Sequence, residues 1–331
     1  MRPFFQATRV SLALAVLAIA PPHSARACLN YYGTDVHGHK KEAPPGMPGS
    51  ADEYMQELMR DGPSREELLK KKEELEGDVA AGFGYKAESD LAATLIYLAE
   101  YRRAIAILQP LAEQHPDEYT LAANLGTAYE LAGDNHKALK WIKEGVRRNA
   151  QAHEGSEWLH VKILEAKIEL EKNPDWLKDR SVSGVDFGDE ATPEPIAAYE
   201  RIALTDLRRA IGYQLRERMG FVKPPDAIVG DLLFDLASVI ALRETVEFAV
   251  PVYELAVTYE APRAALAQKR IDHFRSFSDF GLREQSPGFF GWFVCAGVLV
   301  LIALPFALFF RALYSATEPR RYRDDPTRFT A

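Results

Sequence analysis

The residue types with the clearest chemical potential lie near the beginning of the chain, at His37 and His39. Two imidazoles separated by one residue can bind one metal ion in an extended segment, and Asp35 and Cys28 carry further ligand atoms nearby. This segment supplies no committed third and fourth ligand. We therefore predict no metal site, and His37 and His39 are the candidates should one exist. In the alternative interpretation, these two histidines bind nothing.

Other combinations of chemically active side chains do not form a catalytic motif. The sequence contains no glycine-rich phosphate loop, no nucleophile elbow and no H-E-x-x-H pair. Asp189 and Glu190 lie in a charge-rich stretch, where carboxylates more often serve solvation than acid–base catalysis. His153 and His160 are expected to face solvent or an interface. We predict no enzyme activity, no cofactor and no small-molecule substrate.

The elements that position these residues are indicated by a repeat with a period of 34 residues. The segments 85–118 and 119–152 each run from an apolar helix into a second helix, which begins near Ala104 in the first copy and Ala138 in the second. A fixed period of this length is typical of stacked helix–turn–helix units. One such unit cannot bury its apolar face alone, so we expect at least three stacked units.

Small and large residues recur at matching places in these two copies. The second copy has, at positions 7, 8, 11, 15, 20 and 24 of the repeat, Leu125, Gly126, Tyr129, Gly133, Ala138 and Ile142. The first copy retains Leu91, Ala92, Leu95, Ala104, Leu108 and the closing Pro116. This pattern resembles the tetratricopeptide repeat, which implies a helical solenoid that binds other proteins. The predicted fold class is all-α, a helix–turn–helix repeat solenoid plus one C-terminal transmembrane helix.

The remaining segments are assigned around these two repeats. A third repeat of the same register is expected over 227–263, and a degenerate helical repeat over 153–226. Within the latter, the Gly- and Pro-containing stretch 181–195 is read as an irregular ordered loop or a short hairpin that docks against the repeats. Residues 51–84 are predicted to form N-terminal capping helices, and residues 264–288 a capping helix followed by a linker.

The resemblance also implies a binding groove, because the first helices of successive tetratricopeptide repeats line a concave surface. Carried over onto this chain, the groove positions are Lys86, Asp90, Ala93, Tyr97, Thr120, Asn124, Thr127 and Glu130. The amide of Asn124 can pair with both N–H and C=O of an extended peptide. The family's basic clamp for a terminal carboxylate is not reproduced, since Ser89 and Ala93 occupy its positions in the first copy. In the alternative interpretation, these residues are merely solvated helix faces.

The N-terminus has the organisation of a secretory signal peptide, predicted over 1–27 and cleaved after Ala27. Its apolar run, residues 10–20, spans only about 16 Å as a helix, which is too short to cross a ~30 Å hydrocarbon layer. A retained signal anchor and lipid attachment at Cys28 are the alternatives. The polar, Gly- and Pro-rich segment 28–50 is read as a flexible stalk.

A second apolar segment, 289–310, carries no charged residue and contains fourteen Phe, Leu, Ile or Val residues. At the membrane centre these contribute about −4 to −8 kcal/mol to insertion, so we predict a transmembrane helix. A cleaved signal followed by this span leaves the bulk of the chain extracytoplasmic (periplasmic). Residues 311–331, which begin at Arg311 and contain four further arginines, form the predicted cytoplasmic tail.

Charge and cysteine content narrow the range of partners. Residues 28–288 carry 32 Lys and Arg against 45 Asp and Glu, a net charge of −13, which argues against binding nucleic acid. Cys28 and Cys295 cannot form a disulfide inside the exported part. We therefore expect a membrane-anchored scaffold or adaptor that binds a protein or peptide of the envelope. The alternatives are an assembly factor or structural subunit of a membrane complex and, more distantly, an exported metal- or redox-active protein.

Overall fold

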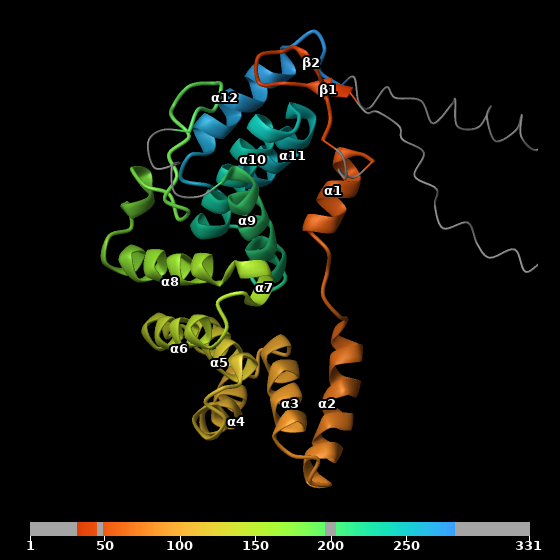
Figure 1. Ribbon diagram of the computed structural model, residues 1–331, viewed down its shortest axis with the longest axis vertical. Coiled ribbons are helices and arrows are strands. Elements are labelled where there is room, and N and C mark those ends of the chain that lie inside the picture. Colours follow the sequence, from red (N-terminus) through yellow and green to blue (C-terminus); the bar gives the residue numbers. More distant parts are fainter. Residues whose placement is uncertain (1–31, 45–48, 196–202, 282–331) are drawn as a thin grey trace, which may run out of the picture.

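The computed structural model describes residues 32–44, 49–195 and 203–281, which form a succession of helices with one small hairpin (Figure 1). In chain order, the elements are β1 (Tyr32–Thr34), β2 (Lys40–Glu42), α1 (Ala51–Leu58), α2 (Arg65–Ala80), α3 (Tyr85–Tyr97), α4 (Tyr101–Gln114), α5 (Tyr119–Leu131), α6 (Asn135–Arg148), α7 (Ala152–Gly155), α8 (Glu157–Lys172), the 3₁₀ turn η1 (Trp176–Lys178), α9 (Leu204–Met219), α10 (Ala227–Arg243), α11 (Val246–Thr258) and α12 (Ala264–Arg275). Successive helices pack on one another, so the predicted helical class is confirmed for this part of the chain.

The helices α3 to α6 form two successive pairs that share their packing chemistry. The alanines at the beginning of the second helices, Ala104 and Ala138, have no exposed surface. Gly126 in α5 lies so close to α6 that an added Cβ would come within 2.6 Å of Ile142 Cδ1. The turns match as well, because Ala99 and Gly133, 34 residues apart, both have a positive φ (62° and 87°). These two helix pairs are therefore compatible with the helix–turn–helix units that the 34-residue period predicts.

The helices α10 and α11 form a third pair that is buried almost completely. Every residue of α10 from Ile228 to Ala241 is buried. The helix begins at Asp226, whose side chain accepts a hydrogen bond from the Val229 N–H at 2.8 Å. At Gly230 an added Cβ would lie 2.7 Å from the Cα of Ala261, so only glycine fits there. The helix α10 is thus covered on all sides, including the side that carries the buried Asp231 and Asp235, and α9, α11 and α12 help to cover it.

Two hydrophobic cores meet at α8. One core contains side chains from α2 to α6, and the other contains side chains from α1 and from α8 to α12. The helix α8 contributes to both, because Leu164 belongs to the first core, whereas Leu159 and Ile163 belong to the second. In Figure 1, α8 accordingly lies between α6 on one side and α9 to α12 on the other.

The segment 181–195 is docked by buried polar side chains. Arg270 of α12 has no exposed surface and donates to the carbonyl oxygens of Phe187 (2.8 Å), Gly188 (2.7 Å) and Glu190 (3.1 Å). Asp235 of α10 accepts from the hydroxyl of Ser183 at 2.6 Å. Because a guanidinium has several fixed donors, one side chain can satisfy three carbonyls of a loop that has no secondary structure of its own. This irregular stretch is therefore held as part of the second core.

The N-terminal residues depart from the expectation of a flexible stalk over 28–50. Residues 32–42 form an antiparallel hairpin, β1–β2, that packs on α11. The Thr34 amide donates to Glu247 Oε2 at 3.0 Å, and its hydroxyl hydrogen bonds to Glu247 Oε1 at 2.6 Å. An added Cβ at Gly33 would lie 2.7 Å from the Glu247 carboxylate, so β1 lies close against α11. The stalk assignment is wrong for this stretch because Glu247, more than 200 residues away, fixes it.

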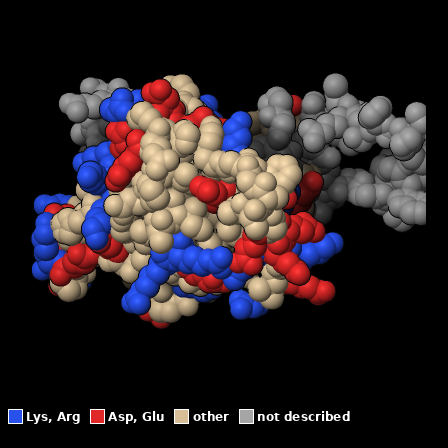
Figure 2. All heavy atoms as spheres, turned by 90° about the horizontal axis from the view of Figure 1, so that it is seen from below, with Lys and Arg blue, Asp and Glu red and all other residues tan. Residues whose placement is uncertain are grey.

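The end of the molecule formed by α2 to α4 has a surface of mixed charge. Seen from below (Figure 2), Lys/Arg and Asp/Glu lie side by side around the edge, and uncharged residues fill much of the middle. The turn between α2 and α3 presents Phe83 with 71% of its surface exposed. Mixed charge of this kind favours solubility over attraction to a polyanion.

Among the described residues, no helix combines the length and the hydropathy needed to cross a bilayer. The predicted span at 289–310 lies outside the described residues, as do the signal peptide at 1–27 and the tail at 311–331.

Candidate functional site

The groove positions predicted from the repeat lie along α3 and α5. Four of these side chains, those of Lys86, Asp90, Tyr97 and Thr120, are exposed, and three, those of Ala93, Asn124 and Thr127, are partly exposed. The last, Glu130, is buried. Seven of the eight positions are therefore accessible to a partner. The eighth, Glu130, is buried and contacts other residues of the chain.

The Tyr97 side of this face is bordered by the end of α9. The rings of Tyr97 and Phe221 lie 4.9 Å apart between centroids and are tilted by 30°. Tyr97 nevertheless keeps 46% of its surface exposed. The linker between α1 and α2 also passes here, since an added Cβ on Gly62 would lie 3.9 Å from the Tyr97 ring. We call the exposed and partly exposed groove positions on α3 and α5 the inner face; Phe221 and the linker between α1 and α2 border it at Tyr97.

Glu130 forms the centre of a buried ionic cluster that joins three helices. Its carboxylate pairs with His160 Nε2 at 2.8 Å, with Lys167 Nζ at 2.7 Å and with the Arg218 guanidinium. Burial would raise the pKa of Glu130, but the charges of Arg218, His160 and Lys167 more than offset this and hold the pKa well below its usual value. The carboxylate is therefore ionised, and its ion pairs hold α8 and α9 against α5.

A second polar cluster lies beside it, at the kink before α8. His153 and Glu154 both have left-handed backbone angles (φ 52° and 57°), which are strained for residues with a Cβ. This kink places His153 Nδ1 2.6 Å from the buried Glu157 carboxylate, and the ring stacks on Tyr213. The hydrogen bond to Glu157 raises the pKa of His153, although burial opposes it.

A small pocket opens between these clusters and the inner face. Its volume is about 80 Å³, and α5, α8 and α9 contribute to its walls. The lining residues are Thr127, Glu130, Leu131, His153, His160, Gln214, Glu217, Arg218, Phe221 and Val222. Two of the predicted groove positions, Thr127 and Glu130, therefore line a cavity whose other lining residues, except Leu131, come from outside the two repeats.

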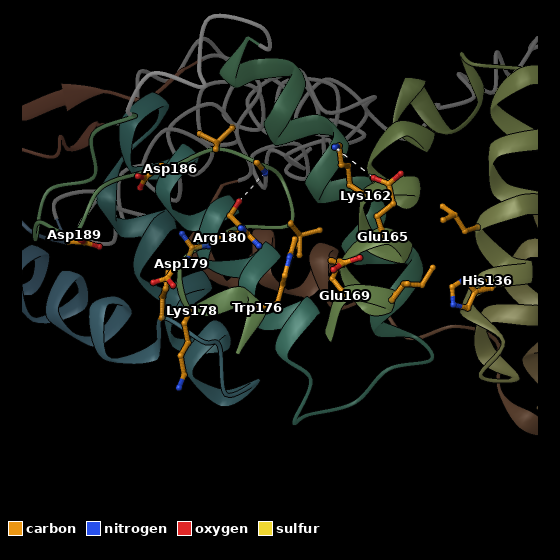
Figure 3. Close-up of a pocket in the computed structure, with 18 residues that line it drawn as sticks. His136, Lys162, Glu165, Glu169, Trp176, Lys178, Asp179, Arg180, Asp186 and Asp189 are labelled. Atoms are coloured by element: carbon orange, nitrogen blue, oxygen red, sulfur yellow. Dashed lines mark hydrogen bonds and ion pairs between the residues drawn. The ribbon is translucent and has the colours of Figure 1, made fainter. Parts of the chain in front are cut away.

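A much wider pocket of about 920 Å³ lies on the other side of α8 (Figure 3). One wall carries Lys162, Glu165 and Glu169 of α8, and the other is formed by the segment 176–189, with Trp176 and Arg180 between them. The Arg180 guanidinium lies 5.6 Å from the centroid of the Trp176 ring.

The polar groups of this wide pocket are mostly paired within the chain. Lys162 lies 3.8 Å from Glu165, and Lys178 lies 3.0 Å from Asp175. Ser181 donates its hydroxyl hydrogen to Asp235 at 2.9 Å, so it is not paired with a histidine as a hydrolytic serine would be. The wide pocket is an open surface that carries side chains of both charges.

The candidate metal residues form part of the turn between β1 and β2. The backbone N–H groups of His37 and His39 both donate to Asp35 Oδ1, at 2.8 Å and 2.9 Å. The two imidazole rings lie 6.4 Å apart. Within the described part of the chain, no group of three or more His, Cys, Asp or Glu side chains is arranged to hold a metal ion. Asp35 stabilises the turn, and Cys28 lies outside the described residues.

Sequence reasoning missed the partners of Glu130. The Arg218–Glu130 pair joins residues 88 positions apart, and periodicity carries no signal for such a contact. A local signal did exist for the neighbouring cluster, because His153 and Glu157 are four residues apart, at the spacing of neighbours on one helix face.

Comparison with known proteins does not assign the chain to a family. No protein-family model matches the sequence, and a search of curated proteins finds no match. The functional interpretation therefore depends on the packing of the helices and on the geometry of the inner face.

Proposed function

We propose that this protein is an exported, membrane-anchored scaffold or adaptor of the tetratricopeptide type, which binds a segment of an envelope protein on its inner face. The repeat assignment is supported by the matched left-handed turns at Ala99 and Gly133 and by the buried alanines Ala104 and Ala138. Export and anchoring are supported by the two apolar segments of the sequence, 1–27 and 289–310.

The arrangement of the first and last described residues is consistent with a single tether. The hydroxyl oxygen of Thr34 in β1 lies 2.8 Å from the carbonyl oxygen of Asp279, and the Gly281 amide lies 3.3 Å from Glu247. The first and last described stretches therefore lie together, at the end opposite α2 to α4 (Figure 1). With a membrane helix at 289–310, the hairpin end faces the bilayer and the repeats extend away from it.

The observation that carries the binding role is the exposure of polar and aromatic side chains on α3 and α5. Tyr97 of α3 is 46% exposed, and Asn124 and Thr127 of α5 are partly exposed. Tyrosine contributes a large contact area at low entropic cost, and an amide can pair with a peptide backbone. Elsewhere on these helices, the apolar residues face the core.

The test is site-specific photo-crosslinking in intact cells. A photoreactive residue at position 124 is expected to capture a discrete envelope protein, whereas the same residue at Lys140, which is exposed on α6, is the matched control. Asn124→Ala combined with Tyr97→Ala should abolish co-purification of that protein. Equal capture from positions 124 and 140 would contradict the proposal. Retention in the double variant, with loss only when 289–310 is exchanged for a foreign helix, would favour assembly through the membrane instead.

A further inference from the structure

The segment 181–185 lies on two buried carboxylates of α10. Asp231 and Asp235 are four residues apart on this helix, and neither has exposed surface. Asp231 Oδ2 accepts a hydrogen bond from the Val182 N–H at 2.8 Å, and Asp235 Oδ2 accepts one from the Ser183 hydroxyl at 2.6 Å. The carboxylate pair therefore holds this segment in its docked position.

One cation bonds to both carboxylates. Arg263, at the beginning of α12, donates from Nη2 to Asp231 Oδ1 at 2.5 Å and to Asp235 Oδ1 at 2.8 Å. Two ionised carboxylates this close together repel each other, and solvent screens the repulsion poorly because both are buried. The docked arrangement therefore favours a state in which one of the two carries a proton.

The other charged groups of the neighbouring elements bond elsewhere or face water. Arg270 of α12 favours the ionised pair through its charge, but it donates to the hydroxyls of Ser238 and Tyr253 and to loop carbonyls. Arg208 of α9 pairs with Glu244, at the end of α10. The charged side chains that line the wide pocket are exposed or partly exposed, so water and salt screen them. They are His136 on α6, Lys162, Glu165 and Glu169 on α8, and Lys178, Asp179, Arg180, Asp186 and Asp189 on the segment 176–189.

The pKa of Asp231 agrees with this geometry. Burial and the charge of Asp235 raise it to about 7, although Arg263 and the Val182 N–H act in the opposite direction. An aspartate in contact with water has a pKa of about 3.9. The proton is thus bound more tightly in the docked arrangement, which is most stable at acidic pH. That stability is lost as the pH rises from about 4 to about 7 and does not change further above it.

The segment 181–185 separates the carboxylate pair from the wide pocket. Ser181, Val182, Gly184 and Val185 line this pocket, whereas α9, α11 and α12 cover other sides of α10. Movement of the segment into the pocket would let water reach both carboxylates. Opening of this segment is therefore the most direct way in which the protein can hydrate an ionised pair.

We propose that the segment 181–185 is a pH-sensitive flap, which a proton on the Asp231–Asp235 pair keeps docked and which opens into the wide pocket when that proton is lost. Arg270 continues to hold the carbonyl oxygens of Phe187 and Gly188, so the movement is confined to the residues before them. The inference does not depend on the proposed binding role of the inner face. In an exported protein, the flap would respond to the pH outside the cytoplasm.

The first experiment measures amide hydrogen exchange of the full-length protein in detergent from pH 5 to pH 8. The exchange rate of peptides that cover 181–185 is divided by the intrinsic rate at the same pH, which gives their protection. We expect this protection to fall by up to about tenfold per pH unit between pH 5 and pH 7, because opening releases one proton, and to level off above pH 7. Protection of α3 in the same samples corrects for changes that affect the whole protein. Equal corrected protection at pH 5 and pH 7 overturns the proposal.

The second experiment assigns the pH dependence to the buried pair. In Asp231→Asn the pair cannot gain or lose this proton, so the fall in protection of 181–185 between pH 5 and pH 7 should disappear. The matched control is Asp189→Asn, which removes an exposed carboxylate from the same loop and should keep the fall. A fall of the same size in Asp231→Asn and in the control would assign the pH dependence to another group and overturn the proposal.

The two experiments do not depend equally on a folded variant. A circular dichroism spectrum that matches that of the unsubstituted protein checks the fold of Asp231→Asn. If this variant does not fold, the pH series of the unsubstituted protein still decides, because it needs no substitution. Capture of a partner from position 124 tests the inner face alone, so the flap and the binding role can fail separately.

Discussion

Glu130 of α5 and Arg218 of α9 form a buried ion pair across the boundary between the two hydrophobic cores. The pair belongs to a cluster that also contains His160 and Lys167 of α8. Charge rather than apolar packing therefore connects the second repeat to the C-terminal helices at this point. Because the same cluster borders the inner face, the stability of the junction and the shape of the proposed binding surface depend on the same residues.

Removal of the Glu130 carboxylate is expected to destabilise the protein strongly. In Glu130→Gln, Arg218 and Lys167 lose their anionic partner while Arg218 remains buried, which costs about 3–5 kcal/mol in the free energy of unfolding. Urea unfolding followed by circular dichroism measures the change. Glu74→Gln, which breaks an exposed pair with Lys70, should leave the unfolding free energy nearly unchanged. Similar effects of the two substitutions would show that the cluster does not hold the junction.

The close approach of α5 and α6 predicts opposite effects of one substitution at two glycines. In Gly126→Ala, the new Cβ meets Ile142 at 2.6 Å, so we expect a loss of about 1–3 kcal/mol in the free energy of unfolding. Gly77 lies in α2 with nothing within 4 Å of its added Cβ, so Gly77→Ala should stabilise the protein by about 0.5–1 kcal/mol. The double variant Gly126→Ala, Ile142→Val should recover part of the loss. Unfolding midpoints of the four proteins decide this.

The helices of the 85–152 segment were predictable because the residues that pack them recur at regular, short spacings in the sequence. Gly126 and Ala138 sit where small residues must occur if two helices approach, and both are buried as expected. The loop at 181–195 could also be located, because Gly184 and Gly188 interrupt the helical pattern. Both signals act over a few residues, which is the range in which a single sequence is informative.

Each feature that we did not predict from the sequence depends on contacts between residues that are far apart in the chain. The hairpin β1–β2 has strands of three residues, too short for an alternating pattern, and Glu247 that fixes it lies 213 residues from Thr34. Arg218 appears from the sequence as an ordinary charged residue near the end of a helix. Its burial arises only because α9 packs beside α5 and α8, and no local pattern encodes that arrangement.

The kink before α8 predicts a pH dependence of stability. Since the pKa of His153 is raised in the folded protein, the protonated imidazole contributes stability that is fully present below its unfolded pKa, near 6.5. That contribution is lost as the pH rises through the folded pKa. Glu157 has a lowered pKa, so its contribution is lost only as the pH falls into the acidic range below about 4.5.

His153→Gln should therefore remove the contribution of His153 to the change in the free energy of unfolding that occurs between pH 6 and pH 8. Between pH 6 and pH 8 the unsubstituted protein is expected to lose unfolding free energy relative to the variant, and at pH 8 the two should approach each other. Urea unfolding at a series of pH values measures the difference. A difference that stays constant from pH 6 to pH 8 would mean that His153 does not titrate in this range.

The docking of the N-terminal hairpin predicts a local rather than a global change. In Thr34→Val, the hydroxyl that donates to Glu247 Oε1 at 2.6 Å and lies 2.8 Å from the Asp279 carbonyl oxygen is lost, while the side chain keeps its shape. The buried Glu247 carboxylate then lacks one donor, at a cost of about 1–3 kcal/mol. Because β1 and β2 pair mainly with each other and with α11, this cost should appear as opening of the hairpin.

Limited proteolysis should then cleave after Lys40 or Lys41 several-fold faster than in the unsubstituted protein. Thr258→Val, at an exposed threonine whose hydroxyl bonds only within α11, is the matched control and should leave cleavage unchanged. Equal cleavage in both variants would mean that the Thr34 hydroxyl does not hold the hairpin against α11.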